Sequence, residues 1–340
     1  MNKINYKQWV LIILSLIIVT VFCGGEGGTG GSGGNGIDGN PTTPSVFFSN
    51  NSDINNYGID FSTSSINKTG VDYISVRRGD YTTGFNIRVS NIANGVKALS
   101  ETPTITFNRG NHFDNGTTIM EFFTSNFSDF KINFHECDRG ESDVACQSER
   151  KHRDLMVLSY QMQTLPTLTI YYVNGAYARN FNEFQLQAEF NSIIKQAVSD
   201  IRIEWRQASL DWDLNNNEKL DENEFEDLLN LTRNRYLWDT RRPGLFILPT
   251  REPLSFHNSH DLLGIANYDF AVVGEGASMR TIIHEALHLQ SIADLRDVNE
   301  TDNLMNGSAN NTGKRLRYHP IVTVRGTTDK QWGNLRWSGH

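Results

Sequence analysis

The chain has 340 residues and a formal net charge of −8, from 31 basic and 39 acidic side chains. This length allows two ordinary domains, or one domain with a long leader, and either could bury a substantial core. The acidic balance and the lack of a Lys/Arg block argue against a nucleic-acid partner, because nucleic-acid-binding proteins carry a basic patch that releases counterions from phosphate.

Residues 1 to 23 predict a signal for export. Lys3 and Lys7 precede an apolar run from Trp9 to Phe22 that is too short to span a membrane. Cys23 follows this run directly and two glycines come after it, so the segment resembles the lipobox of bacterial lipoproteins. The resemblance implies lipidation of Cys23 and a lipid anchor to a bacterial membrane, at the cell surface or in the periplasm. A plain secreted protein is the alternative.

Residues 24 to 45 predict a flexible tether, because ten of the seventeen residues from 24 to 40 are glycine. Residues 46 to 163 then predict a small all-β domain, in which short β-type runs alternate with Asn, Gly, Ser and Asp turn clusters. The runs are Gly58 to Phe61, Tyr73 to Val76, Asn86 to Val89, Thr104 to Phe107 and Phe130 to Phe134. This domain shows no catalytic motif, and the roles of spacer, pro-segment and docking module all stay open.

Cys137 and Cys146 are predicted to form a disulfide, since an exported protein meets an oxidising compartment. The two residues lie nine positions apart around a polar loop, and Cys23 is left for the lipid. A pro-segment cysteine that blocks a zinc ion is the alternative.

From residue 164 to the C-terminus the pattern predicts an α+β domain. Leu168 to Val173 is an apolar run of strand type, and Asn182 to Ala208 carries apolar residues at steps of three and four, which predicts one long helix. Three further strands are predicted at Gly244 to Leu248, Leu262 to Ile265 and Phe270 to Val273, followed by a helix from Ser278 to Gln290.

The segment from Asp213 to Glu224 resembles an EF-hand calcium loop. Oxygen ligands fall at loop positions 1, 3, 5, 9 and 12, and a backbone carbonyl is offered at position 7. These residues are Asp213, Asn215, Asn217, Asp221, Glu224 and, for the carbonyl, Lys219. Glu218 stands where EF-hands have glycine. The resemblance implies an EF-hand-like insertion at about 209 to 232 that binds calcium weakly; a polar helix-helix turn is the alternative.

The residues His284, Glu285 and His288 form an HExxH motif within the predicted helix 278–290. Histidines four residues apart share one helical face, so both imidazoles can bind one metal ion while the glutamate turns toward the metal-bound water. A helix with two surface histidines and no metal is the alternative. A catalytic zinc needs a third protein ligand, and Asp294 lies ten residues after His284.

With Asp294 the motif resembles the HExxHxxGxxH/D pattern of metzincin peptidases, and Met305 resembles their Met-turn. The resemblance covers roughly residue 165 to the C-terminus. It implies a twisted, mostly parallel sheet with one antiparallel edge strand, and zinc held by His284, His288 and Asp294. Ser291 stands where the family usually has glycine, and serine carries more backbone strain than glycine in a left-handed conformation.

Asp329 is a rival third ligand. The segment from Gly326 to Gly333 resembles the GTxDxxYG motif of aspzincin peptidases, with Trp332 in place of tyrosine. In a competing interpretation Thr328 and Gln331 form a capping box and Asp329 lies in the first turn of a final helix.

These patterns together predict a zinc-dependent endopeptidase that acts on a protein or peptide substrate, with Glu285 as general base. Two alternatives stay open. One is a metal-binding surface lipoprotein without catalytic activity, such as an adhesin or docking module, and the other is an aspzincin-type peptidase that uses Asp329.

Overall fold

The structure is a computed structural model that describes residues 44–337 with gaps at 50–57, 62–70, 81–83, 103–104, 126–127, 236–243, 251–253, 257–258, 263, 268–269, 296–302, 307–313, 315, 317, 319–320 and 324–325. The predicted export signal with Cys23 and most of the predicted tether lie outside the described residues. No helix in the described part of the chain has the length and apolar character needed to cross a bilayer.

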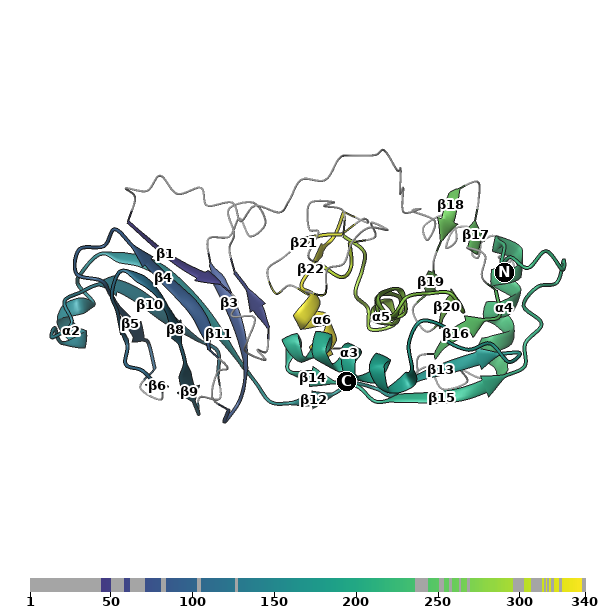
Figure 1. Cartoon of the computed structure of the whole chain (residues 1–340), viewed down its shortest axis with the longest axis horizontal. Coiled ribbons are helices and arrows are strands. Elements are labelled where there is room, and N and C mark those ends of the chain that lie inside the picture. The colour runs from purple at the N-terminus through teal and green to yellow at the C-terminus, as the bar shows by residue number, and fades with distance from the viewer. Residues whose placement is uncertain are drawn as a thin grey trace, which may run out of the picture.

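The described chain is a mixed α/β structure made mostly of strands. Its first part is a strand-rich unit with two sheets (Figure 1). The smaller sheet has the order β1 (Ser45–Ser49), β4 (Phe85–Ser90), β8 (Gly116–Met120). The larger sheet has the order β2 (Ile59–Asp60), β3 (Asp72–Arg77), β11 (Lys151–Tyr160), β10 (Phe130–Glu136), β5 (Val96–Ser100), β7 (His112–Phe113). A short pair, β6 (Ile105–Phe107) with β9 (Phe122–Thr124), and the helical turn α2 (Asp143–Cys146) complete the unit.

The two sheets of this unit pack face to face over one apolar core. Phe48 and Ile87 of the smaller sheet belong to the same buried cluster as Ile74 and Phe134 of the larger sheet. The rings of Phe48 and Phe134 lie 5.1 Å apart between centroids. Alternation of buried and less buried residues along β4 places every second side chain in this core, which is the pattern of a half-buried strand.

The second part begins at β12 (Gln163–Thr164) and contains a five-stranded sheet. Its strand order is β15 (Ile203–Ala208), β13 (Leu168–Val173), β16 (Gly244–Leu248), β20 (Phe270–Gly274), β19 (Gly264–Asn267). The first four strands run parallel, and β19 pairs antiparallel with β20 at the edge. The remaining elements are α3 (Glu183–Ile194), η1 (Lys195–Ala197), β14 (Ser199–Asp200), α4 (Glu222–Arg235), β17 (Leu254–Phe256), β18 (Ser259–Leu262), α5 (Met279–His288), β21 (Ile321–Val322), β22 (Thr328–Asp329) and α6 (Gln331–Trp337).

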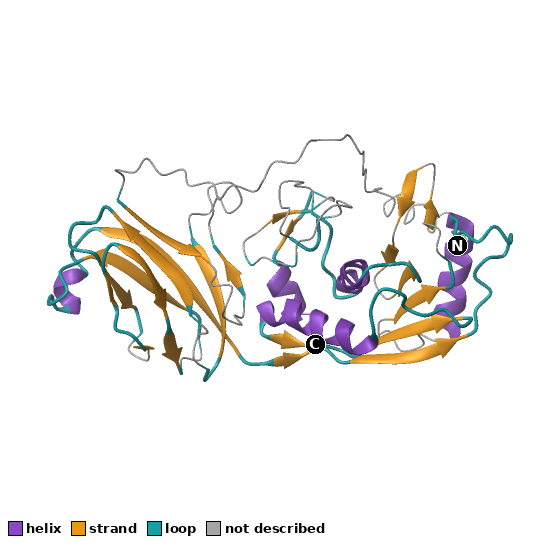
Figure 2. Ribbon diagram, in the orientation of Figure 1, coloured by secondary structure: helices purple, strands orange, loops and turns teal. Residues whose placement is uncertain are grey.

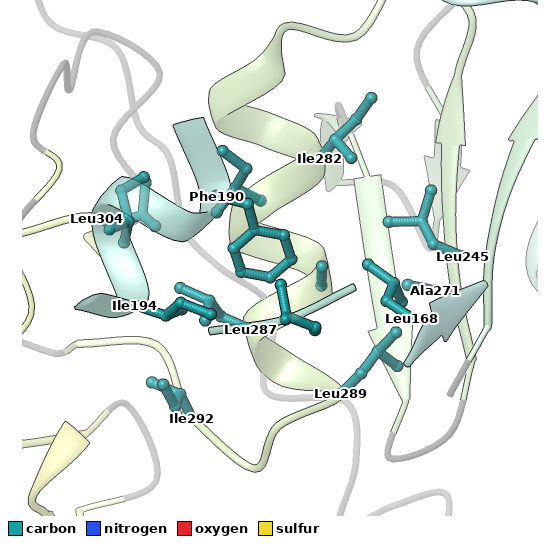
Figure 3. Packing of buried hydrophobic residues seen from close by; sticks show 14 of the residues in the cluster. Leu168, Phe190, Ile194, Leu245, Ala271, Ile282, Leu287, Leu289, Ile292 and Leu304 are labelled. Carbon is teal, nitrogen blue, oxygen red and sulfur yellow. The ribbon is translucent and has the colours of Figure 1, made fainter. Parts of the chain in front are cut away.

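Helices cover both faces of this sheet, which explains why its central strands are continuous apolar runs. On one face, α3 and α5 bury Phe190 and Leu287 against Leu168 and Leu245 of the strands (Figure 3). On the other face, Phe225 of α4 lies in a second buried cluster with further strand residues. Figure 2 shows the helices around the orange strands and the separate strand-rich unit at the other end of the molecule.

The predicted single helix from Asn182 to Ala208 is wrong in its second half. The helix α3 ends at Ile194, and Val198 takes a left-handed conformation with φ of 53° after the turn η1. The chain then forms β14 and β15 instead. Residues 201–208 can also be read with a period of two, and parallel pairing of β15 with β13 satisfies their backbone groups, so tertiary pairing overrides the helical pattern.

The same error removes the helix that was expected to enter the EF-hand-like loop. The element before Asp213 is the strand β15, and the helix α4 follows the loop. The loop therefore connects a strand to a helix.

The strand-rich unit packs directly on the second part of the chain. The hydroxyl of Ser75 donates a 2.6 Å hydrogen bond to the carbonyl of Gln196. A Cβ atom added at Gly58 would lie 2.2 Å from that same carbonyl oxygen and 2.3 Å from the ring of Trp332. Glycine at position 58 thus permits a close approach between the two units.

Candidate metal centre

The helix α5 carries the HExxH residues. Ser278 caps its N-terminus, because the Ser278 hydroxyl accepts a 3.1 Å hydrogen bond from the backbone N–H of Thr281. The apolar face of α5 packs into the core over the sheet, so the helix is fixed in rotation. His284 and Glu285 are both buried, and His288 is half-buried near the end of the helix.

The chain leaves α5 through a sharp turn at Ser291. The backbone N–H of Ile292 donates to the carbonyl of Leu287 (3.2 Å), and that of Ser291 donates to His288 (2.9 Å), which is the Schellman pattern of helix termination. Ser291 has a φ of 62°, in the left-handed region that favours glycine. A serine therefore adopts here the conformation for which glycine is usual.

This turn brings Asp294 back toward both histidines. Asp294 Oδ1 lies 3.0 Å from His284 Nε2 and 3.5 Å from His288 Nε2. Ligand atoms of the three residues all lie within 4.8 Å of one another. Adjacent ligand atoms on a tetrahedral zinc with bonds of about 2.0–2.1 Å stand about 3.3 Å apart, so the two separations fit such an ion.

The hydrogen bonding of the potential ligand atoms is also compatible with a metal ion. Asp294 Oδ1 is buried, and within the described residues no group gives it a hydrogen bond of normal geometry despite the two close nitrogens. Three potential ligand atoms thus face one another. Two imidazoles and a carboxylate are a donor set that zinc accepts.

Backbone carbonyls hold the far side of each imidazole. Nδ1 of His284 donates to the carbonyl of Leu304 (3.0 Å), and Nδ1 of His288 donates to the carbonyl of Ile292 (2.7 Å). A carbonyl can only accept, so each Nδ1 carries a proton, and in the neutral ring Nε2 is the atom with the free lone pair. Both rings therefore present a ligating atom toward Asp294.

Charge interactions shift the pKa values of the cluster. Burial disfavours the charged form of His288, but attraction by Asp294 outweighs burial and raises the pKa of His288 to about 9. Burial likewise disfavours the Asp294 carboxylate, but the charge of His288 outweighs this and holds the pKa of Asp294 well below its usual range. The attraction between these two side chains thus favours a positive charge at this position.

Glu285 lies against the edge strand β19. Burial raises the pKa of the Glu285 carboxyl. A Cβ atom at Gly264 would lie 2.6 Å from Cγ and 2.9 Å from Oε1 of Glu285, so the absence of a side chain at 264 leaves room for the carboxyl group. A buried carboxylate with a raised pKa suits the role of a proton acceptor near neutral pH.

Met305 lies in a buried turn that contacts this cluster through the carbonyl of Leu304. Its backbone N–H donates to Oδ1 of Asn303 (2.9 Å), and its carbonyl accepts a 3.1 Å hydrogen bond from the N–H of Leu295. Met305 and Leu304 are fully buried in the same core as α5. The turn is thus linked both to the residue after Asp294 and to His284.

The EF-hand-like loop folds around its own carboxylates. Asp213 accepts hydrogen bonds from the backbone N–H groups of Asn217 (2.9 Å) and Glu218 (3.0 Å). Glu224 accepts from the N–H groups of Asn215 and Asp221, both at 3.1 Å. Other bonds join the remaining polar residues of the loop: Asn215 Nδ2 donates to Asp221, and Lys219 N–H donates to Asn217 Oδ1.

Glu218 takes a left-handed conformation with φ of 60° at the position where EF-hands have glycine. Its carbonyl accepts a 2.7 Å hydrogen bond from the hydroxyl of Thr250, which fastens the loop to the segment after β16. The loop thus makes the sharp turn that an EF-hand makes, with glutamate in place of glycine.

The other predicted site residues fall elsewhere. The backbone of Asp329 lies in β22, before α6 rather than in its first turn, and its side chain is outside what the structure describes. Cys23 also lies outside the described residues. Cys137 and Cys146 form a disulfide with 5.5 Å between their Cα atoms, beside α2 in the strand-rich unit.

Two residues at the site were not found from the sequence. Arg280 donates from Nη2 to the carbonyls of Leu304 and Asn306, at 2.7 and 2.9 Å. Its spacing of four before His284 could have placed it on the motif face of the helix. Gly264 had no such signal, because a glycine at an edge strand does not reveal which side chain approaches it.

Comparisons with known proteins find only distant similarity. No family model matches the chain, and no curated protein matches it. A zinc-dependent peptidase from Methanocorpusculum labreanum is 13% identical with a TM-score of 0.29, over 42% of this chain and 89% of that one. Metalloproteinase-II from Bacteroides fragilis is 9% identical with a TM-score of 0.29, over 72% and 80%. A sialyltransferase from Photobacterium damsela is 9% identical with a TM-score of 0.20, over 72% and 52%.

Proposed function

We propose that the chain is a zinc-dependent endopeptidase of the metzincin type, with zinc held by His284, His288 and Asp294. The observation that carries the proposal is the convergence of two Nε2 atoms on Asp294 Oδ1, at 3.0 and 3.5 Å, beside the buried carboxyl of Glu285. Three protein ligands leave one position for water or substrate, which is the arrangement of catalytic rather than structural zinc sites.

The residues around the proposed zinc position have distinct roles in peptide hydrolysis. Zinc, when bound, supplies a Lewis acid that lowers the pKa of water and polarises the peptide carbonyl. Glu285 accepts a proton from the attacking water and returns it to the leaving amine, and the raised pKa of its carboxyl suits both transfers. Leu304 and Ile292 keep the Nδ1 protons in place through their carbonyls, so both imidazoles stay oriented.

Several features support the metzincin type in particular. The sheet is parallel apart from the antiparallel edge strand β19, α5 follows the inner strand β20, and the chain turns sharply at Ser291. Met305 is buried in a turn whose backbone is bonded to the residue after Asp294. The substrate proposed is a protein or peptide, because β19, the strand beside Glu285, stands at the edge of the sheet in the described part of the chain.

Replacement of the general base tests the proposal. We expect Glu285→Gln to reduce cleavage of casein by about 10²- to 10⁴-fold while zinc content stays near one ion per chain, because general-base catalysis contributes that much and Glu285 is not a ligand. Glu275→Gln is the control, since Glu275 is also buried but pairs with Arg179. Equal cleavage by wild type and Glu285→Gln would favour a metal-binding protein without catalytic activity.

We also propose that the protein is an exported lipoprotein. The proposal depends on Cys23 and the apolar run before it in the sequence. Mass spectrometry of the mature protein tests it: an N-terminal lipid-modified Cys23 is expected, and Cys23→Ala should release the protein from membranes. A mature N-terminus elsewhere would favour plain secretion.

A calcium ion at the loop from Asp213 to Glu224 is a separate proposal. It is supported by the EF-hand order of oxygen-bearing residues and by the sharp turn at Glu218. The proposed role is to stabilise the connection between β15 and α4, since the loop packs behind the sheet on the face opposite α5.

A further inference from the structure

Arg280 lies one helical turn before His284 on α5, and its guanidinium reaches the turn that contains Met305. Nη2 donates to the carbonyl of Leu304 (2.7 Å) and to that of Asn306 (2.9 Å), the residues on either side of Met305. Hydrogen bonds from a charged donor are among the stronger ones in proteins. Arg280 is thus a side chain that ties this turn, residues 303–306, to the zinc helix.

The carbonyl of Leu304 accepts two of these hydrogen bonds. One comes from Arg280, and the other comes from Nδ1 of His284 at 3.0 Å. A carbonyl oxygen has two lone pairs and can accept both. Any movement of this carbonyl would turn the His284 ring, because among the described residues Leu304 is the hydrogen-bond partner of the outer nitrogen of the ring.

The same turn also reaches the third ligand. The carbonyl of Met305 accepts from the N–H of Leu295, the residue directly after Asp294. A displaced turn would therefore disturb two of the three ligands, His284 through its ring and Asp294 through its backbone. His288 would be spared, because its Nδ1 bonds to Ile292 instead.

We propose that Arg280 is a positioning residue for the metal site, which holds the turn 303–306 on α5 so that Leu304 orients His284 toward Asp294. The inference rests on the proposed function, since it concerns the same zinc ligands. Partners of metal-bound histidines typically change metal affinity by about 10- to 100-fold when they are removed.

The test compares zinc binding by wild type, Arg280→Ala and Arg280→Lys in the full chain. Zinc affinity is measured by competition with a chromophoric chelator, and ligand geometry is followed by the visible spectrum of the cobalt-substituted protein. We expect Arg280→Ala to bind zinc about 10- to 100-fold more weakly with a changed cobalt spectrum. Arg280→Lys should lie between, because lysine keeps the charge but lacks the planar guanidinium.

Arg179→Ala is the matched control. Arg179 also contacts the segment that leads into α5, through its ion pair with Glu275, but the structure gives it no contact with the turn 303–306. This variant can lose stability, yet its zinc affinity and cobalt spectrum should equal those of wild type. Thermal unfolding of all variants separates lost stability from lost metal affinity.

Hydrogen exchange of the metal-free protein adds a readout that needs no zinc. The amides of Leu295 and Met305 are bonded within or to the turn, so Arg280→Ala should exchange them faster than Arg179→Ala does. Wild-type zinc affinity and cobalt spectrum in Arg280→Ala would overturn the inference while leaving the proposed function intact. If Arg280→Ala fails to fold, the same result for Arg280→Lys overturns it. A wild-type chain that binds no zinc would remove the proposed function itself.

Discussion

The cluster of His284, His288 and Asp294 and the EF-hand-like loop hold their potential ligand atoms in opposite ways. At the cluster, backbone carbonyls bond the outer atoms of His284 and His288, and the inner atoms face Asp294. In the loop, backbone N–H groups bond the carboxylates of Asp213 and Glu224 directly. Carbonyls that bond the outer nitrogens leave the inner ligand atoms of the cluster available to a cation. In the loop, the backbone amides already occupy some of the lone pairs with which the carboxylates would bind a cation.

This difference predicts that cations matter more at the cluster than at the loop. Attraction by Asp294 raises the pKa of His288 to about 9, so a metal ion that binds there displaces a proton. The loop is already closed by its own hydrogen bonds, so a calcium ion adds to a conformation that exists.

The largest effect is expected for Asp294→Ala. The variant would leave two histidine ligands, fewer than the three that a catalytic zinc needs, so zinc should fall from about one ion per chain to almost none after dialysis. Asp329→Ala should keep its zinc, and Asp213→Ala should keep it as well. Zinc content measured by mass spectrometry of the metal decides the matter. Loss of zinc from Asp329→Ala but not from Asp294→Ala would favour the aspzincin-type site.

Gly264→Ala should reduce kcat by about 10²-fold with zinc content unchanged, because a displacement of a catalytic group by about 1 Å can cost that much. The added methyl group would meet Glu285 at 2.6 Å. Gly276→Ala is the control, since a Cβ atom there meets nothing within 4 Å. Steady-state kinetics with a peptide substrate check the result, and a normal kcat in Gly264→Ala would show that Glu285 has room elsewhere.

Zinc affinity should rise with pH by about tenfold per unit between pH 6.5 and about 9, since zinc displaces one proton from His288. The pKa of His288 is raised in the folded, metal-free protein. Its attraction to Asp294 therefore stabilises that protein fully below pH 6.5 and is lost as the pH rises toward 9.

Chelator competition at several pH values measures the zinc affinity, and NMR titration of the His288 ring in the metal-free protein measures the pKa. Asp294→Asn should lower the His288 pKa, because it removes the charge that attracts the proton. A zinc affinity that does not change with pH, or a wild-type His288 ring with an ordinary pKa, would contradict the expected rise in affinity.

The candidate site residues that the sequence could group together lie close to one another along the chain. His284 and Glu285 share one helix, and the sharp turn needed for Asp294 follows from helix termination a few residues later. The sequence did not predict that Arg280 and Gly264 contact the candidate site. Their contacts depend on how the turn 303–306 and the edge strand β19 pack against α5, which is a matter of tertiary structure.

The fold was predictable to a similar degree. Buried strands such as β13 and β16 appear in the sequence as apolar runs, because both of their faces are covered. Residues 201–208 were misassigned as helix, since Ile201, Ile203 and Trp205 fit a period of two as well as a helical stripe. The left-handed Val198 and the pairing of β15 with β13 decide between the two patterns, and neither is visible in the local sequence.

Calcium is expected to have a smaller effect than zinc. A weak extracellular site, with a Kd of about 10⁻³ to 10⁻⁴ M, stabilises a protein by roughly 1 kcal/mol at about 2 mM calcium. Thermal unfolding in calcium should exceed that in equal magnesium, and trypsin should cut after Lys219 more slowly in calcium. Asp213→Ala should abolish both differences and keep its zinc. Identical unfolding and cleavage in the two salts would leave the loop as a polar turn held by its own hydrogen bonds.

The smallest effects concern a property that the two regions share. Ser291 and Glu218 have φ values of 62° and 60°, each at a position where the family that its segment resembles has glycine. A left-handed conformation costs a residue with a side chain roughly 1–2 kcal/mol. Glycine avoids this cost, but its unfolded state is more flexible, so the net stabilisation is smaller. Ser291→Gly and Glu218→Gly should therefore each raise the free energy of unfolding by about 0.5–1 kcal/mol, measured by chemical denaturation. Glu218→Gly should also bind calcium more tightly, whereas Ser291→Gly should leave calcium binding unchanged. If either glycine variant is less stable than wild type, the replaced side chain makes contacts that outweigh the strain of its backbone conformation.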